Sequence, residues 1–214
     1  MVMPGQFLER PALIPVDAWV LEGVSHRGTR RPPLLILPPS PAEGGSMDHV
    51  VGAELAWAVT REDHPTLRFN HRGIGASQGE PGDAAAWVED VRAAMTVASE
   101  NAGGAPVALA ALGASVQTAL AALDAAPERV AGLCLISPGP LSPDALRHRR
   151  LPMLMVLGTA EPTQGRLPLA TALAEASGRL ELVEDADATW TRGLPALGRI
   201  VARWLRSLEP HPTG

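Results

Sequence analysis

The chain has 214 residues and a formal net charge of −5, and 46% of its residues are hydrophobic and 19% are charged. These proportions are typical of a soluble globular protein. All 18 basic residues are arginine, and tyrosine is absent from the sequence. The composition therefore excludes chemistry that depends on a Schiff-base lysine, a phosphate-binding lysine or a tyrosine acid.

The distribution of charge and cysteine excludes further classes. No block of like charge suggests nucleic-acid binding, and no apolar run is long enough to span a membrane. The single cysteine, Cys134, rules out an internal disulfide and favours a cytoplasmic protein. It lies in an apolar, strand-like run and is interpreted as a packing residue. No two histidines or cysteines have metal-ligand spacing, so a metal is not predicted. The glycine-rich loop at 73–79 lacks dinucleotide-binding spacing, and no cofactor is predicted either.

Short apolar runs alternate with longer amphipathic runs, which predicts strands alternating with helices. In chain order we expect strands at 18–25 and 34–39, a helix at 46–63 capped by Ser46, a strand at 65–70, a glycine-rich loop at 71–83, a helix at 84–101, a strand, turn and helix within 107–123, strands at 130–137 and 151–158, a helix at 167–178, a strand at 179–184 and a helix at 194–208.

Repeated strand–helix–strand units predict an α/β fold with a mostly parallel sheet and helices on both faces. A single domain over residues 1–214 is expected, with residues 1–15 as a loosely ordered extension and 208–214 as a loosely ordered tail. The short stretch between Ser137 and Leu151 leaves no room for a sizeable lid.

Several segments resemble the small lidless α/β-hydrolase superfamily proteins. The most specific is LRFNHRGIGASQGE at 67–80, and others lie at 37–51, 126–138, 157–162 and 184–190. The resemblance implies an α/β-hydrolase fold, in which a serine on a sharp strand-to-helix turn works with a histidine and an acid. The fold alone does not imply that activity.

Two registers place the nucleophile of this motif. In one, the five residues Ala111–Ser115 fill the motif and Gly113 stands at the nucleophile position; in the other, Ser115 does, and bulky Gln117 fills a place that suits a small residue. In the resembling proteins a Pro-x-Arg-Val segment follows the nucleophile by about fourteen residues. Here the spacing is 127 − 113 = 14 for Gly113 and 127 − 115 = 12 for Ser115, which favours Gly113. Glycine also adopts freely the positive φ that such a turn needs.

The other catalytic positions are changed as well. The resemblance places Glu161 at the acid position and Ala188 where the histidine should stand, and no histidine falls in that turn. An acid without its histidine has nothing to orient. Prolines 38, 39 and 41 reduce the number of N–H donors in the expected oxyanion loop. The main-chain N–H groups of Ser40 and Ala114 are the remaining candidates for an anion-binding notch.

The predicted function is that of a non-hydrolytic pseudo-enzyme that binds a small ligand or a protein partner. No catalytic residue is expected, since the triad-equivalent positions hold Gly113, Glu161 and Ala188. One alternative is an active serine ester hydrolase with a rearranged site using Ser115 or Ser40, and another is a non-covalent catalyst in the same pocket. His71 is interpreted as a surface-loop residue and His49 as a packing or solvent contact. The predicted ligand pocket consists of Pro39, Ser40, Gly113, Ala114, Glu161 and Ala188.

Overall fold

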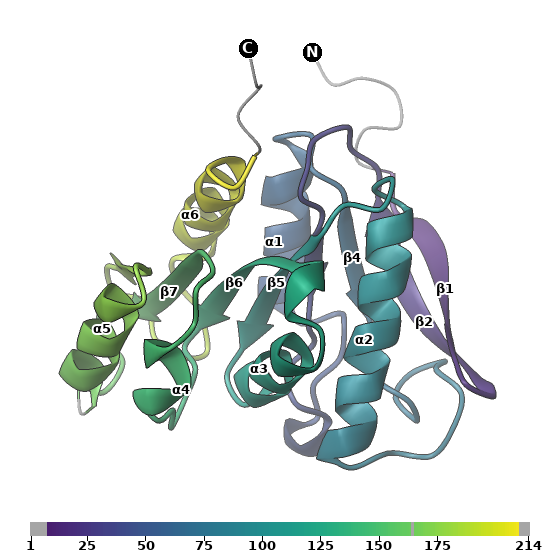
Figure 1. Ribbon diagram of the computed structural model, residues 1–214, viewed down its shortest axis with the longest axis horizontal. Helices are drawn as coiled ribbons and strands as arrows, with labels where there is room; N and C mark the ends of the chain where they lie inside the picture. The colour runs from purple at the N-terminus through teal and green to yellow at the C-terminus, as the bar shows by residue number, and fades with distance from the viewer. Residues whose placement is uncertain (1–7, 164, 210–214) are drawn as a thin grey trace.

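The computed structural model describes residues 8–163 and 165–209, and these form an eight-stranded sheet with helices on both faces (Figure 1). The strands are β1 (Arg10–Val16), β2 (Trp19–His26), β3 (Leu34–Ile36), β4 (Thr66–Phe69), β5 (Val107–Leu112), β6 (Val130–Ile136), β7 (Met153–Gly158) and β8 (Arg179–Val183). The helices are α1 (Val50–Thr60), α2 (Ala84–Glu100), α3 (Ser115–Ala125), α4 (Asp144–Arg147), α5 (Arg166–Glu175) and α6 (Leu194–Arg206), with short 3-10 turns η1 (Pro41–Glu43) and η2 (Pro127–Arg129).

The sheet order is β1-β2-β4-β3-β5-β6-β7-β8. β1 and β2 pair antiparallel, β2 and β4 pair antiparallel, and every pair from β4 to β8 is parallel. This confirms the predicted α/β-hydrolase fold with its mostly parallel sheet. The chain enters each central strand from the same end, so the carboxyl ends of β3 to β8 all meet at one edge of the sheet.

The central strands are buried on both faces, and their side chains alternate between two cores. Along β3, Leu34 and Ile36 join the core under α1 and α6, while Leu35 joins the core on the other face. The core on that other face includes side chains from α2, α3 and α5, such as Met95 and Val116. This two-sided burial explains why the central strands read as continuous apolar runs.

The N-terminal residues 10–15 do not form the loosely ordered extension that was predicted. They belong to β1, an edge strand whose Ile14 is fully buried and pairs with Leu21. In the sequence, Pro11 and Pro15 argue against a strand. Proline is nevertheless tolerated at a sheet edge, because one side of such a strand needs no N–H donors. Residues 1–7 and 210–214 lie outside the described residues.

The first helix starts later than predicted, because Ser46 is not its N-cap. α1 begins at Val50, and His49 caps it by accepting a hydrogen bond from the Val51 N–H at 3.3 Å. The Met47 N–H instead donates to Asn70 Oδ1 at 2.7 Å, and Arg68 donates to the Met47 carbonyl at 2.9 Å. These bonds to the end of β4 hold the residues before His49 outside the helix.

Two further features concern the apolar segments. Among the described residues, no helix combines the length and hydropathy needed to cross a membrane.

Cys134 lies fully buried in β6, in agreement with its interpretation as a packing residue, and burial raises the pKa of its thiol.

Candidate functional site

The carboxyl ends of the parallel strands bring the sequence-predicted site segments to one edge of the sheet. Gly113 follows β5, Ser137 follows β6, Glu161 lies in the turn after β7, and residues 184–190 follow β8. In open α/β sheets, this edge is where ligands and catalytic groups gather.

Gly113 forms the sharp turn between β5 and α3. Its φ is 59°, and its N–H donates to the Ile136 carbonyl of the neighbouring strand at 3.0 Å. A Cβ at this position would meet one atom within 4 Å, Glu43 Oε2 at 3.9 Å. The turn therefore has the left-handed backbone and the open space that a nucleophile elbow needs, but it carries no side chain.

Ser115 lies beyond this turn, in the first turn of α3, and is 2% exposed. Its hydroxyl donates to the Leu112 carbonyl at 2.8 Å and accepts from the Leu112 N–H at 3.2 Å. The side chain is thus directed back toward the end of β5 and is occupied by backbone groups. These two bonds connect the first turn of α3 to the end of β5 across Gly113.

Glu161 reaches back across the edge of the sheet to the end of β6. Its Oε1 accepts hydrogen bonds from Ser137 Oγ at 2.7 Å and from the Gly158 N–H at 2.6 Å. Ser137 Oγ also accepts a hydrogen bond from Trp190 Nε1 at 3.0 Å. A chain of three side chains, Trp190–Ser137–Glu161, therefore connects the turns that follow β8, β6 and β7.

The turn after β8 buries an indole and exposes an alanine. Trp190 is fully buried, whereas Ala188, two residues earlier, is exposed. A Cβ at Gly158 would lie 2.0 Å from the Ala186 carbonyl, so this turn packs directly against the acid turn. In the same turn, the Thr189 hydroxyl donates to Asp187 Oδ1 at 2.6 Å, and this bond lowers the pKa of the Asp187 carboxyl.

The loop after β3 contains the residues predicted to form an anion-binding notch. Ser40 is buried at the start of η1, and its carbonyl accepts from the N–H groups of Glu43 at 2.9 Å and Gly45 at 3.1 Å. Ala114 stands exposed directly before α3. The notch formed by their N–H groups stays a prediction.

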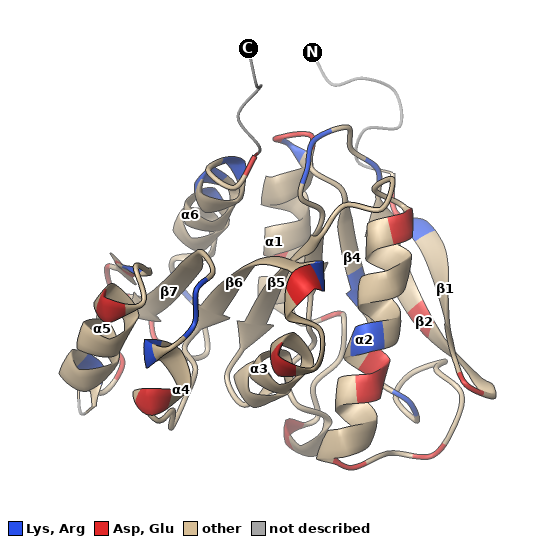
Figure 2. Cartoon of the chain, viewed as in Figure 1, with Lys and Arg blue, Asp and Glu red and all other residues tan. Residues whose placement is uncertain are grey.

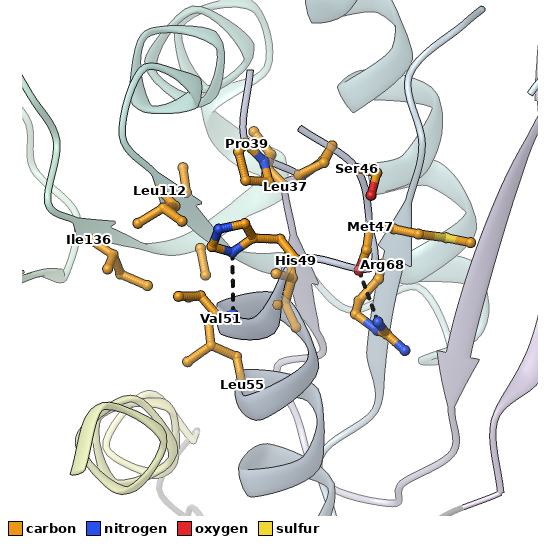
Figure 3. A pocket seen from close by; sticks show the side chains of 15 residues that line it. Leu37, Pro39, Ser46, Met47, His49, Val51, Leu55, Arg68, Leu112 and Ile136 are labelled. Atoms are coloured by element: carbon orange, nitrogen blue, oxygen red, sulfur yellow. Dashed lines mark hydrogen bonds between the residues drawn. The ribbon is translucent and has the colours of Figure 1, made fainter. Parts of the chain in front are cut away.

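A cavity of about 10 Å³ lies below this loop, between β3, β5 and the start of α1 (Figure 3). That is close to the space that one water molecule needs. His49 projects into it beside Leu112, and burial lowers the pKa of its imidazole. Among the six residues of the predicted ligand pocket, only Pro39 lines this cavity, so that pocket also stays a prediction.

His71 is not a surface-loop residue, contrary to the sequence prediction. It is 1% exposed, and its Nδ1 lies 3.1 Å from Oδ2 of the fully buried Asp90 in α2. Arg72 binds the same carboxylate through Nε at 2.8 Å, and the His71 ring packs edge-on against Phe69. The partner is 19 residues away in sequence, so no local pattern indicated this anchor of the glycine-rich loop.

Ser137 and Trp190 also have roles that the sequence did not indicate. Both have positive φ, 43° and 56°, which side-chain-bearing residues adopt at a cost. No sequence signal marks either position, because their contact joins two loops that are 53 residues apart. Within residues 8–163 and 165–209, no group of three or more His, Cys, Asp or Glu residues is arranged to hold a metal ion.

The sheet order and the glycine elbow define an α/β-hydrolase-fold protein. The model of a family described as serine aminopeptidase, S33, matches residues 44–160, more than half of the chain. The chain belongs to this family.

Solved structures agree with the fold over nearly the whole chain. An α/β serine hydrolase homologue from Coxiella burnetii is 24% identical, with 95% of this chain and 98% of that chain covered and a TM-score of 0.77. A lidless α/β serine hydrolase from Xanthomonas campestris is 20% identical, with 95% and 96% covered and a TM-score of 0.78. A dienelactone hydrolase from Anabaena variabilis is 18% identical, with 95% and 99% covered and a TM-score of 0.75. No curated protein matches the sequence.

Proposed function

We propose that this chain is a non-hydrolytic member of its family, a pseudo-enzyme that keeps the hydrolase fold and uses the former catalytic edge to bind a small ligand or a protein partner. The observation that carries the proposal is Gly113. It occupies the elbow between β5 and α3 with a φ of 59°, and it has no atom that could attack a carbonyl.

The position of the general base supports the same proposal. A serine hydroxyl is a weak nucleophile at its free pKa and needs an adjacent base. Ala188 stands where the family resemblance puts the histidine, and it is exposed on the turn after β8. The turn does contain a ring nitrogen, that of Trp190. Unlike a histidine nitrogen, an indole N–H only donates hydrogen bonds and cannot accept a proton.

The state of the acid is a third line of support. Glu161 Oε1 accepts hydrogen bonds from Ser137 Oγ and from the Gly158 N–H. In a working triad the acid orients the imidazole and stabilises its charged form. Here the carboxylate instead ties two loops together, which is a structural role.

The rearranged-hydrolase alternative finds little support at its two serines. The Ser115 hydroxyl is buried and bonded in both directions to Leu112. Ser40 is 7% exposed and lies within a proline-rich loop. An enclosed ligand site also finds little support, since the cavity under this loop is about 10 Å³. Binding at an open edge agrees better with that size.

The test is turnover of activated esters by the purified protein. We expect the rate of p-nitrophenolate release from p-nitrophenyl acetate to equal the rates of the Ser115→Ala and Ser40→Ala variants. The reason is that no nucleophile–base pair exists to be removed. Turnover by the wild type that disappears in either variant would contradict the proposal and identify the serine responsible.

A further inference from the structure

A second feature lies away from the catalytic edge, along the outer surface of the two helices that cover one face of the sheet. α1 and α6 pack side by side there, and a groove of about 690 Å³ runs between their exposed faces. Its lining includes Trp57 from α1, Arg61 directly after that helix, and a row of arginines from α6. Nothing in the proposed function uses this groove.

The α6 wall of the groove is cationic. Arg199, Arg203 and Arg206 recur at spacings of four and three residues, which puts them on one face of the helix. All three are exposed, while the opposite face of α6 is buried in the core. Figure 2 shows the basic residues on this helix.

The α1 wall adds an exposed aromatic side chain. Trp57 is 47% exposed, although buried tryptophans such as Trp190 and Trp204 show that the fold can enclose this residue type. The Arg61 guanidinium lies 4.6 Å from the centroid of the Trp57 ring. Tryptophan and arginine are the residue types most enriched at the energetic centres of protein interfaces.

The charge balance of the groove is opposite to that of the chain. Its lining contains four arginines and two glutamates, Glu54 and Glu62, whereas the whole chain has a net charge of −5. Arg206 is paired with Glu62 at 3.0 Å, and Glu54 lies near Arg199. Among the described ion pairs, Arg203 takes part in none.

From this arrangement we infer that the α1–α6 groove is a docking surface for an acidic segment of a partner protein, whose carboxylates pair with Arg199 and Arg203 and whose apolar side chains pack on Trp57. A nucleic acid is the less suitable occupant. The groove is short, two glutamates lie within it, and the rest of the chain repels phosphates through its negative charge. Complementary charge of this kind chiefly sets the rate and the specificity of association.

The experiment measures fluorescence anisotropy of a labelled peptide rich in glutamate and leucine, titrated with the full chain at low ionic strength. Its counterpart has every glutamate replaced by glutamine. We expect the acidic peptide alone to bind, and the Arg199→Glu/Arg203→Glu variant to weaken binding about tenfold or more. Trp57→Gln should also weaken it, and added salt should weaken the wild type more than the charge-reversed variant.

The matched control is Arg92→Glu/Arg150→Glu, which changes the net charge equally at exposed arginines outside the groove lining. It should leave the affinity nearly unchanged. Circular dichroism checks that each variant is folded, and Arg199→Gln/Arg203→Gln provides a milder change if the reversal unfolds the protein. Equal weakening by the control pair, equal binding of the glutamine peptide, or tighter binding of a single-stranded oligonucleotide would overturn the inference. Self-association lost in the groove variants would also overturn it, since a second copy would then be the occupant.

Discussion

The indole Nε1 of Trp190 donates a 3.0 Å hydrogen bond to Ser137 Oγ, and both residues have positive φ. Ser137 Oγ in turn donates a hydrogen bond to Glu161 Oε1 at 2.7 Å. The turns that follow β8, β6 and β7 are therefore joined to one another by these three side chains. Their polar atoms Trp190 Nε1, Ser137 Oγ and Glu161 Oε1 bond to one another.

The first prediction concerns the coupling between Trp190 and Ser137. Trp190→Phe and Ser137→Ala should each lower the free energy of unfolding by about 1–3 kcal/mol, since the first removes the donor to Ser137 Oγ and the second leaves the buried Trp190 N–H without its acceptor. The double variant should lose less than the sum, with a coupling of at least about 0.5 kcal/mol in urea denaturation. Additive losses would show that the hydrogen bond contributes nothing beyond packing.

The second prediction concerns the backbone at Gly113. Gly113→Ala should lower the free energy of unfolding by about 1–2 kcal/mol, because an L-residue is strained at a φ of 59°. Gly139→Ala is the matched comparison, since Gly139 has a φ of 62° and a Cβ added there would meet no atom within 4 Å. We expect the two losses to agree. A much larger loss at Gly113 would mean that the space above the elbow is not open.

The third prediction concerns rebuilding the triad. Gly113→Ser alone supplies a nucleophile without a base, and Ala188→His alone supplies a base without a nucleophile. Together they should produce weak esterase activity that neither shows alone, because triad members act as a unit. Adding Ser137→Ala should raise it further, since that change removes one of the two hydrogen bonds that hold Glu161 Oε1 and leaves the one from the Gly158 N–H.

A crystal structure of the double variant provides the control for that experiment. The introduced hydroxyl and imidazole should lie within hydrogen-bond reach, about 3 Å. If the two side chains point into different spaces, the assignment of Gly113 and Ala188 as triad-equivalent positions is wrong, whatever the activity.

The fourth prediction concerns acid sensitivity. Burial lowers the pKa of His26 below 6.5, with a further decrease from Arg68 that Glu9 opposes. The folded state therefore binds this proton less readily than the unfolded state. The stabilising contribution is present above pH 6.5 and is lost as the pH falls from 6.5 toward the lowered folded-state pKa. Denaturant unfolding measured between about pH 5 and pH 7, the range in which histidine titrates, should show that the free energy of unfolding decreases as the pH is lowered, and His26→Gln should reduce that slope.

The fifth prediction concerns Cys134. Its thiol is fully buried, and desolvation raises its pKa. Because only the thiolate is an effective nucleophile, iodoacetamide should leave the native protein unmodified and alkylate it in denaturant. Rapid modification of the native state, measured by intact mass, would show that β6 opens readily.

Much of the fold followed from apolar periodicity. The buried run Leu34–Leu37 and the strand–turn–helix at 107–123 contain the whole signal within a few residues, because every strand residue packs on one core or the other. β1 was missed because its prolines argue against a strand, whereas an edge position accepts them.

The site was predictable only where one residue carries the information. The positive φ of Gly113 was predictable because glycine adopts it freely at the strand-to-helix turn that the sequence indicates. The contact between His71 and Asp90 and the Trp190–Ser137–Glu161 connection depend on residues distant in the chain. Such contacts arise from the order of the strands in the sheet, and the pattern of residues within a short segment does not indicate them.

The most direct test of the central claim is intact-mass analysis after incubation of the native protein with a fluorophosphonate, which labels activated serine nucleophiles. A protein that lacks a nucleophile–base pair should keep its unmodified mass, while the Gly113→Ser/Ala188→His variant should gain one adduct slowly. A stoichiometric adduct on the wild type, mapped to Ser40, Ser115 or Ser137, would show that the site has been rearranged and remains catalytic.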